Sequence, residues 1–338
     1  MMDRCSDPPV LDPQSPLATY WDRPVCELAT LAGPELRPEL KERHYLYSLL
    51  VGALVSNYWN GNKRGHYGTY PWREKQRLPN GIYGGGQYLG HNIACIGVDG
   101  FGEVIDFDFN HNEVFSSSVE HAESRLVRRV FSLAQVYDDW RIRRQEDLPR
   151  SQGYANLLGN VTIYTSLESC AQCSGIMALG QVKSVVYLQH DPGQFVIGNI
   201  LWKLTSSGLK APLPISADQF SFPYYNALND AYKDFYARVP REPFYIDAKG
   251  TKDNSQSITS FLCTDVAKSI VDRAVDELKS FTVQYPEFTP TDTESDNSRL
   301  LTNFQVQQHI RDFYTMPLRP VVAVLLISSE MKLRRFHG

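Results

Sequence analysis

The chain has few cysteines, no long apolar run and no strong net charge. Its six cysteines lie at positions 5, 26, 95, 170, 173 and 263 and show no paired framework. A secreted, disulfide-stabilised protein is therefore not expected, and a reducing compartment is favoured. The N-terminal residues lack the apolar core of a signal peptide, and no stretch approaches the length of a membrane span. We expect a soluble cytoplasmic protein without a membrane partner.

The charge balance also narrows the expected partners. A formal net charge of -4 gives the molecule no overall attraction to a phosphate backbone, which weighs against long nucleic acid as the main partner. Hydrophobic residues make up 42% of the chain, enough to bury the core of one large domain or two small ones.

Two short motifs carry the chemistry. Cys170 and Cys173 form a Cys-x-x-Cys pair at the predicted start of a helix, where the helix N-terminus favours thiolates. His121 can supply a third ligand from the start of another helix. Three protein ligands suit a catalytic zinc ion, because a structural zinc site closes with four. Glu123 is offset from His121 on the helix, so it is better placed to carry a proton than to bind the metal.

Each motif taken alone has a simpler interpretation. A lone Cys-x-x-Cys can be a redox pair or half of a structural zinc site, and a lone histidine is usually an ordinary helix residue. The combination of His121, a glutamate at this offset and the cysteine pair favours the catalytic zinc interpretation.

The run Tyr164–Met177, followed by Val182–Tyr187, resembles the cytidine and deoxycytidylate deaminase superfamily, and within it the tRNA adenosine deaminase branch. The similarity extends over about residues 37 to 205 and is strongest in the two motifs. It implies that His121, Cys170 and Cys173 bind Zn²⁺. It also implies that Glu123 is the catalytic residue in hydrolytic deamination of a cytosine-type or adenine-type base, with release of ammonia. The base would belong to a nucleoside, a nucleotide or a nucleic acid.

Two further residues follow from the resemblance. Asn110 matches an asparagine that contacts the bound nucleoside in the tRNA adenosine deaminase branch, although asparagine also commonly ends a strand. Ser169 stands where the family has proline. We expect Ser169 to cap the helix start that proline would otherwise preset.

The predicted fold is an α/β, three-layer α/β/α cytidine-deaminase-like sandwich with a mixed sheet and a C-terminal extension. Helices are expected at 38–56, 120–137, 170–180, 224–239, 258–281 and 300–314, and strands at 93–98, 103–109, 161–165, 183–188 and 320–327. The strand–helix–strand unit around the cysteine motif predicts a parallel pair with a right-handed crossover. The first of these helices is expected to be amphipathic and to cover one sheet face.

The predicted division comprises a proline-rich lead-in (residues 1–36), a zinc-dependent deaminase domain (37–247) and a C-terminal extension of unknown role (248–338). The glycine-rich stretch 57–90 is either a substrate-selecting loop or a surface insertion, with Lys63, Arg64 and His66 as candidate phosphate contacts.

The arginines of the segment from 125 to 144 form either a solvated face or a nucleic-acid footprint. A different class of function also stays open: a non-catalytic partner subunit with the same fold that binds zinc for structure, in a homo- or hetero-oligomer. A scaffold needs zinc ligands but no proton carrier, so the presence of Glu123 argues against it.

Overall fold

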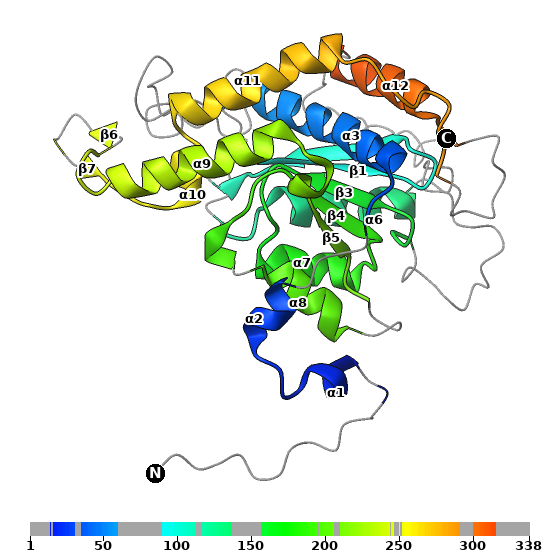
Figure 1. The fold of residues 1–338 in the computed structure, drawn as a ribbon, viewed down its shortest axis with the longest axis horizontal. Coiled ribbons are helices and arrows are strands. Elements are labelled where there is room, and N and C mark those ends of the chain that lie inside the picture. The colour runs from blue at the N-terminus through cyan, green and yellow to red at the C-terminus, as the bar shows by residue number, and fades with distance from the viewer. Residues whose placement is uncertain are drawn as a thin grey trace, which may run out of the picture.

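The computed structural model describes residues 14, 16–30, 35–59, 90–112, 117–136, 157–194, 196–205, 210–243, 245–246, 250, 252–290 and 300–315. A five-stranded mixed sheet lies at its centre, in the order β2-β1-β3-β4-β5 (Figure 1). These strands are β1 (Ala94–Val98), β2 (Val104–Phe109), β3 (Thr162–Thr165), β4 (Ser184–Tyr187) and β5 (Leu213–Ser216). β1 is antiparallel to both β2 and β3, whereas β3, β4 and β5 are parallel.

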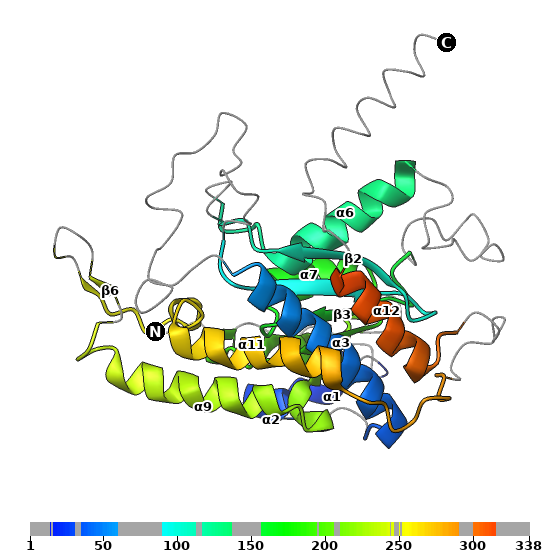
Figure 2. The same ribbon diagram turned by 90° about the horizontal axis from the view of Figure 1, so that it is seen from above.

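Helices cover both faces of this sheet. One layer contains α3 (Pro38–Asn57), α9 (Pro223–Arg238), α10 (Ile258–Phe261), α11 (Asp265–Ser280) and α12 (Asn303–Thr315), and the opposite layer contains α6 (Ala122–Val136), α7 (Ala171–Leu179) and α8 (Ile197–Leu204) (Figures 1 and 2). Neighbouring residues of β3 show the two faces. The Tyr164 ring lies 4.9 Å from the ring of Tyr47 on α3, whereas Thr165 contacts Glu123 on α6.

Smaller elements complete the described chain. The N-terminal helices α1 (Pro16–Tyr20) and α2 (Val25–Thr30) contact α8. Short 3-10 helices occupy Pro192–Gln194 and Ala217–Phe220, and β6 (Tyr245–Ile246) pairs with β7 (Lys252–Asp253) in a separate two-stranded sheet.

The predicted α/β sandwich with a mixed sheet is confirmed. The parallel pairing of β3 and β4 is also as predicted. Strand β5 and helix α8 were not predicted, because β5 contains a proline and α8 is only eight residues long. The helix predicted at 258–281 is two helices, since Thr264 caps a new one by accepting a hydrogen bond from the Ala267 N–H.

Helix α3 is buried on all sides, which corrects the amphipathic interpretation. Every residue from Leu46 to Val55 is buried, because the sheet lies on one side and α11 and α12 pack on the other. Gly52 permits the close approach of α11: a Cβ at this position would lie 2.9 Å from Cβ of Ala274. A helix that is apolar all round needs such a second cover. The C-terminal helices therefore share one core with the sheet.

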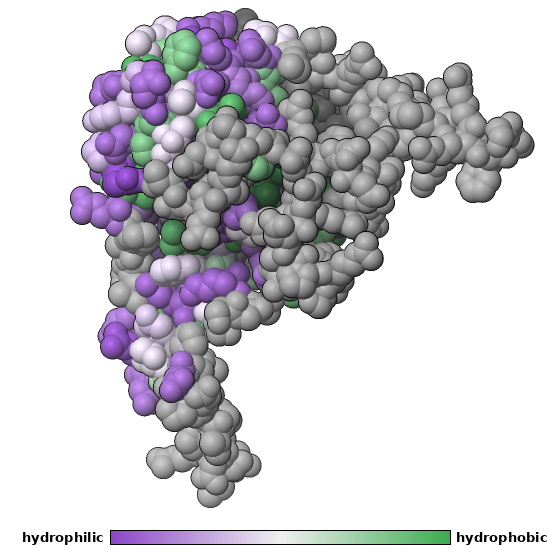
Figure 3. Space-filling view, turned by 90° about the vertical axis from the view of Figure 1, so that its right-hand side faces the viewer, coloured by the Kyte–Doolittle hydropathy of each residue, from purple (hydrophilic) through white to green (hydrophobic). Residues whose placement is uncertain are grey.

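Several predicted features lie outside the described residues. They are Lys63, Arg64 and His66, most of the 57–90 stretch, Arg141, Arg143 and Arg144, and the strand at 320–327. Within the described part of the chain, no helix is both long enough and apolar enough to span a membrane. On the face in Figure 3, hydrophilic and hydrophobic residues are interspersed over the described surface.

Candidate metal centre

Two helix starts bring the three predicted ligands together. His121 directly precedes α6, and its carbonyl oxygen accepts the Arg125 N–H of the first turn. Cys170 is the N-cap of α7, and its sulfur accepts the Cys173 N–H at 3.5 Å. Both helices lie on the same face of the sheet and contact each other. The loop from β2 to α6 and the loop from β3 to α7 thus meet at the carboxyl ends of these two strands.

The distances among the donor atoms fit a tetrahedral zinc ion. Nδ1 of His121 lies 3.4 Å from Sγ of Cys170 and 3.5 Å from Sγ of Cys173, and all three ligand atoms lie within 4.8 Å of one another. Zinc bonds of about 2.3 Å to sulfur and about 2.0 Å to nitrogen, at tetrahedral angles, separate S and N by about 3.5 Å. Among the described residues, these three form the one group of histidine, cysteine or acidic side chains close enough to hold a metal. The donor set therefore suits zinc with one open position.

Charge is unevenly shared between the two thiols. The hydrogen bond with Cys173 is the largest cause that lowers the pKa of Cys170, to about 4, and the same contact raises the pKa of Cys173. The hydrogen bond with Cys170 raises the pKa of His121. The pair thus stabilises one thiolate beside the imidazole, and a thiolate is the form that binds a metal.

Glu123 lies beside the three ligand atoms without joining their group. Its side chain is buried, and burial raises its pKa. Oε1 accepts hydrogen bonds from Thr165 Oγ1 at 3.2 Å and Ser169 Oγ at 3.1 Å, while Oε2 lies 3.4 Å from Sγ of Cys173. A buried carboxylate next to a metal group, but outside it, has the position of a proton carrier.

Ser169 has a different role from the one expected from the sequence. We expected it to cap α7, but the cap is Cys170, whose sulfur accepts the Cys173 N–H. The Ser169 hydroxyl points instead to Glu123. A sulfur atom can take the capping position here because Cys170 has the extended backbone of an N-cap, with φ -69° and ψ 172°.

Ser124 and Gln172 lie behind the second thiol. Nε2 of Gln172 donates to Ser124 Oγ at 3.0 Å, and Ser124 Oγ lies 3.5 Å from Sγ of Cys173. Because an amide NH₂ can only donate, the serine hydroxyl is free to direct its own hydrogen at the sulfur. This contact could not be predicted from the sequence, because it joins residues of two helices that are far apart along the chain.

Asn110 directly follows β2, and its side chain contacts the start of α6. Its Oδ1 accepts the Ala122 N–H at 2.8 Å, and the side chain is buried. The oxygen therefore helps to fix the helix that follows His121. Contact between Asn110 and a nucleoside stays a prediction. The Asn110 side-chain NH₂ group would make it, because the oxygen is already hydrogen-bonded to Ala122.

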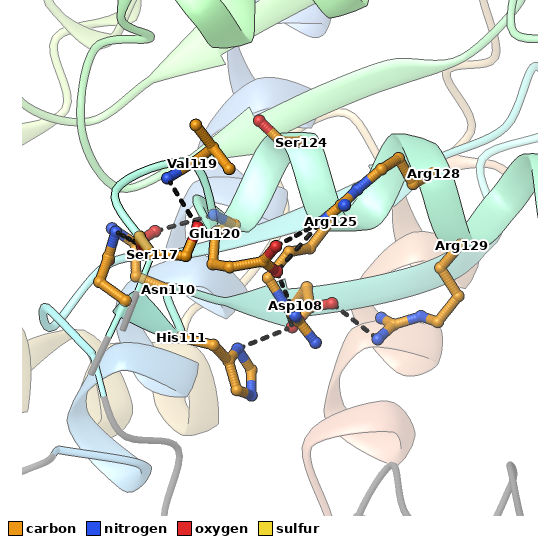
Figure 4. A network of polar contacts seen from close by, with 12 residues as sticks. Asp108, Asn110, His111, Ser117, Val119, Glu120, Ser124, Arg125, Arg128 and Arg129 are labelled. Carbon is orange, nitrogen blue, oxygen red and sulfur yellow. Dashed lines mark hydrogen bonds and ion pairs between the residues drawn. The ribbon is translucent and has the colours of Figure 1, made fainter. Parts of the chain in front are cut away.

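The arginines of α6 are paired with carboxylates (Figure 4). Arg129 contacts Asp106 at 2.5 Å and Asp108 at 2.7 Å, and Arg125 contacts Glu120 at 2.7 Å. The Arg125 and Arg129 side chains are only 15% and 19% exposed. Both arginines act as counter-ions to the buried Asp108 of β2, and Arg129 also pairs with the half-buried Asp106. Arg125 and Arg129 therefore form neither the solvated face nor the nucleic-acid footprint expected from the sequence.

A hydrogen-bonded His–Glu pair near the carboxyl ends of β3 and β4 was not predicted. Nδ1 of His190, just after β4, lies 2.5 Å from Oε2 of Glu168, and this hydrogen bond raises the pKa of His190. The Asp191 N–H donates to the same oxygen at 3.1 Å. Glu168 thereby ties the loop that carries the cysteines to the loop after β4.

Sequence comparison with known proteins does not assign the chain to a family. No family model and no curated protein matches the chain. Among solved structures, a tRNA:A34 deaminase studied for A-to-I editing at the wobble position shows 20% identity and a TM-score of 0.27, over 37% of this chain and 82% of that one. Guanine deaminase from Nitrosomonas europaea shows 19% identity and a TM-score of 0.26, over 39% of this chain and 71% of that one. TM-scores of this size do not establish a shared fold. The evidence for a metal site is therefore the distances between the three ligand atoms and the burial of the residues around them.

Proposed function

We propose that this chain is a zinc-dependent hydrolase that deaminates a nucleobase of the cytosine or adenine type and releases ammonia. One observation carries the proposal: His121, Cys170 and Cys173 lie within 4.8 Å of one another, and the buried carboxylate of Glu123 lies beside them. Zinc deaminases of nucleobases use this set of residues, with the glutamate as general acid and base and not as a ligand.

The three ligand residues would hold the zinc ion. When bound, zinc lowers the pKa of a coordinated water molecule towards neutrality, which makes the water an effective nucleophile at C4 of cytosine or C6 of adenine. In such a site Glu123 takes a proton from the attacking water and delivers it to the ring nitrogen. It then transfers the second water proton to the amino group, which leaves as ammonia while the water oxygen remains on the ring carbon as a carbonyl. Burial of Glu123 suits both steps, because a raised pKa brings the carboxylate closer to the working pH.

The geometry disfavours the redox interpretation of the cysteine pair. A dithiol needs no histidine, yet Nδ1 of His121 lies 3.5 Å or less from both sulfur atoms. Asn110, whose side-chain oxygen accepts the Ala122 N–H of α6, is the proposed contact for the sugar or base.

The test is ammonia release by the zinc-loaded protein, with Glu123→Gln as the matched variant. We expect release from at least one member of a panel containing cytidine, deoxycytidylate, adenosine, single-stranded DNA and tRNA. Glu123→Gln should keep its zinc and lose turnover. A zinc-loaded wild type that is silent on the whole panel would contradict the proposal and favour a non-catalytic zinc-binding subunit.

A further inference from the structure

Two hydroxyl groups converge on one oxygen of Glu123. Thr165 Oγ1 lies 3.2 Å and Ser169 Oγ 3.1 Å from Oε1, and all three side chains are buried. An ionised carboxylate can only accept hydrogen bonds, so both hydroxyls are the donors. Each hydroxyl has a single hydrogen, which is therefore used in this contact.

We propose that Thr165 and Ser169 are positioning residues that hold Oε1 of Glu123 and leave Oε2 to carry the proton. The inference rests on the proposed deaminase function. Oε2 is the oxygen on the side of the ligand atoms, 3.4 Å from Sγ of Cys173, and neither hydroxyl contacts it. We call the Thr165 and Ser169 hydroxyls the clamp. The clamp fixes the position of the carboxylate through Oε1 and leaves Oε2 to exchange the proton.

The donors are attached to rigid backbone. Thr165 ends β3, and its carbonyl oxygen accepts the Leu188 N–H across the parallel pair. Ser169 directly precedes Cys170, and its carbonyl oxygen lies 3.4 Å from the Ser174 hydroxyl of α7. Groups fixed in this way can hold a carboxylate to within a fraction of an ångström, as proton transfer requires.

Ser169 distinguishes this chain from the common pattern of the superfamily. The signature places proline before the first cysteine, and proline has no hydroxyl to donate. The serine therefore supplies a contact to the glutamate that the proline pattern lacks. We expect the rate to depend on it, because removal of the Ser169 hydroxyl leaves Thr165 Oγ1 as the remaining hydroxyl donor to Oε1.

The kinetic test uses Ser169→Ala, Thr165→Val and the double variant on whichever panel substrate the wild type turns over. Neither residue is proposed to touch substrate, so kcat should fall with little change in KM, by roughly tenfold for each single change and more for the double. Ser169→Thr should restore most of the rate. Ser166→Ala is the matched control, because Ser166 lies in the same loop as Ser169 and has a hydroxyl too. That hydroxyl accepts the N–H of Ala94 in β1 and does not contact Glu123. Unchanged kcat in all three test variants, with Glu123→Gln inactive, would overturn the clamp.

A second measurement does not need a substrate. Crystal structures of the zinc-loaded wild type and of the Thr165→Val/Ser169→Ala protein would locate the Glu123 carboxylate directly. The clamp predicts one ordered position in the wild type and a rotated or disordered carboxylate in the double variant, with zinc content equal in both. A carboxylate that keeps its position without the hydroxyls would overturn the inference, whatever the activity panel shows. Failure of the proposed function alone would instead appear as silence on the panel.

Discussion

At the scale of single residues, hydroxyl groups from other elements support the three proposed zinc ligands and Glu123. The donor atoms of His121, Cys170 and Cys173 lie within 4.8 Å of one another. The contacts behind them involve Ser124, Thr165 and Ser169, which are common residue types with no distinctive spacing. Such contacts depend on the register between a strand and two helices, so only the folded chain reveals them.

Removal of one ligand should abolish zinc binding without unfolding the protein. We expect wild-type protein to retain one zinc ion per chain through dialysis against a chelator, and Cys173→Ser to lose it, because a serine hydroxyl is a much poorer zinc ligand than a thiolate. The measurement is metal content by mass spectrometry. Cys26→Ser is the matched control, since Cys26 is exposed and belongs to α2. Full zinc retention in Cys173→Ser would show that the metal, if any, binds elsewhere.

At the scale of elements, the strands and helices that carry the site were predicted, but β5 was not. The order of β1, β2, α6, β3, α7 and β4 follows the sequence-based prediction, because each has a clear apolar pattern and a turn or cap beside it. Strand β5 is as short as β3 and β4 but contains Pro214, which cannot donate a hydrogen bond to a neighbouring strand, so it lacked a strand signal of its own. Its pairing is supplied by β4, which lies beside it in the sheet.

The turn between β1 and β2 gives a prediction about pH. Burial raises the pKa of Asp99 to about 6, although Oδ1 accepts the N–H groups of Phe101 and Glu103 at 2.9 Å each. An acid whose pKa is higher in the folded state binds its proton more tightly there than in the unfolded chain. Its stabilising effect is therefore complete below the unfolded pKa of 3.8 and is lost as the pH rises through about 6.

Asp99→Asn should remove this pH dependence, because the amide keeps an oxygen for the two N–H groups and cannot ionise. We expect the variant to be more stable than wild type at pH 7 by about 1 to 3 kcal/mol and equal to it below about pH 4. Urea unfolding of both proteins across this pH range is the measurement. A variant that is less stable than wild type at pH 7 would show that the charged carboxylate supports the turn.

At the scale of the whole molecule, the C-terminal helices complete the core over α3. The sequence suggested an extension from residue 248 onwards, and this division remains a prediction. The apolar residues of α3 were read as one stripe because the sequence does not show which distant helix covers the other side. Polar contacts add to the apolar packing of this cover: the Glu42 carboxylate accepts the N–H groups of Gln284 and Tyr285 and the Asn303 amide.

Loss of this carboxylate should weaken the whole fold. Glu42 is only 8% exposed, so Glu42→Ala would remove the acceptor of the buried Asn303 amide and of two backbone N–H groups of the loop before α12. We expect a loss of about 3 kcal/mol in unfolding free energy, with a single cooperative transition and unchanged zinc content. Thermal unfolding of the zinc-loaded protein checks this, with Glu39→Ala, in the first turn of the same helix, as the matched control. An early separate transition in Glu42→Ala would mean that the C-terminal helices unfold on their own.

Ammonia release by zinc-loaded wild type and Glu123→Gln, side by side on the nucleoside, nucleotide, single-stranded DNA and tRNA panel, tests the central claim most directly. The site geometry predicts that the wild type releases ammonia from at least one substrate class, and that the variant binds the same amount of zinc but releases none. Equal release from both proteins, or none from a fully zinc-loaded wild type, would contradict it.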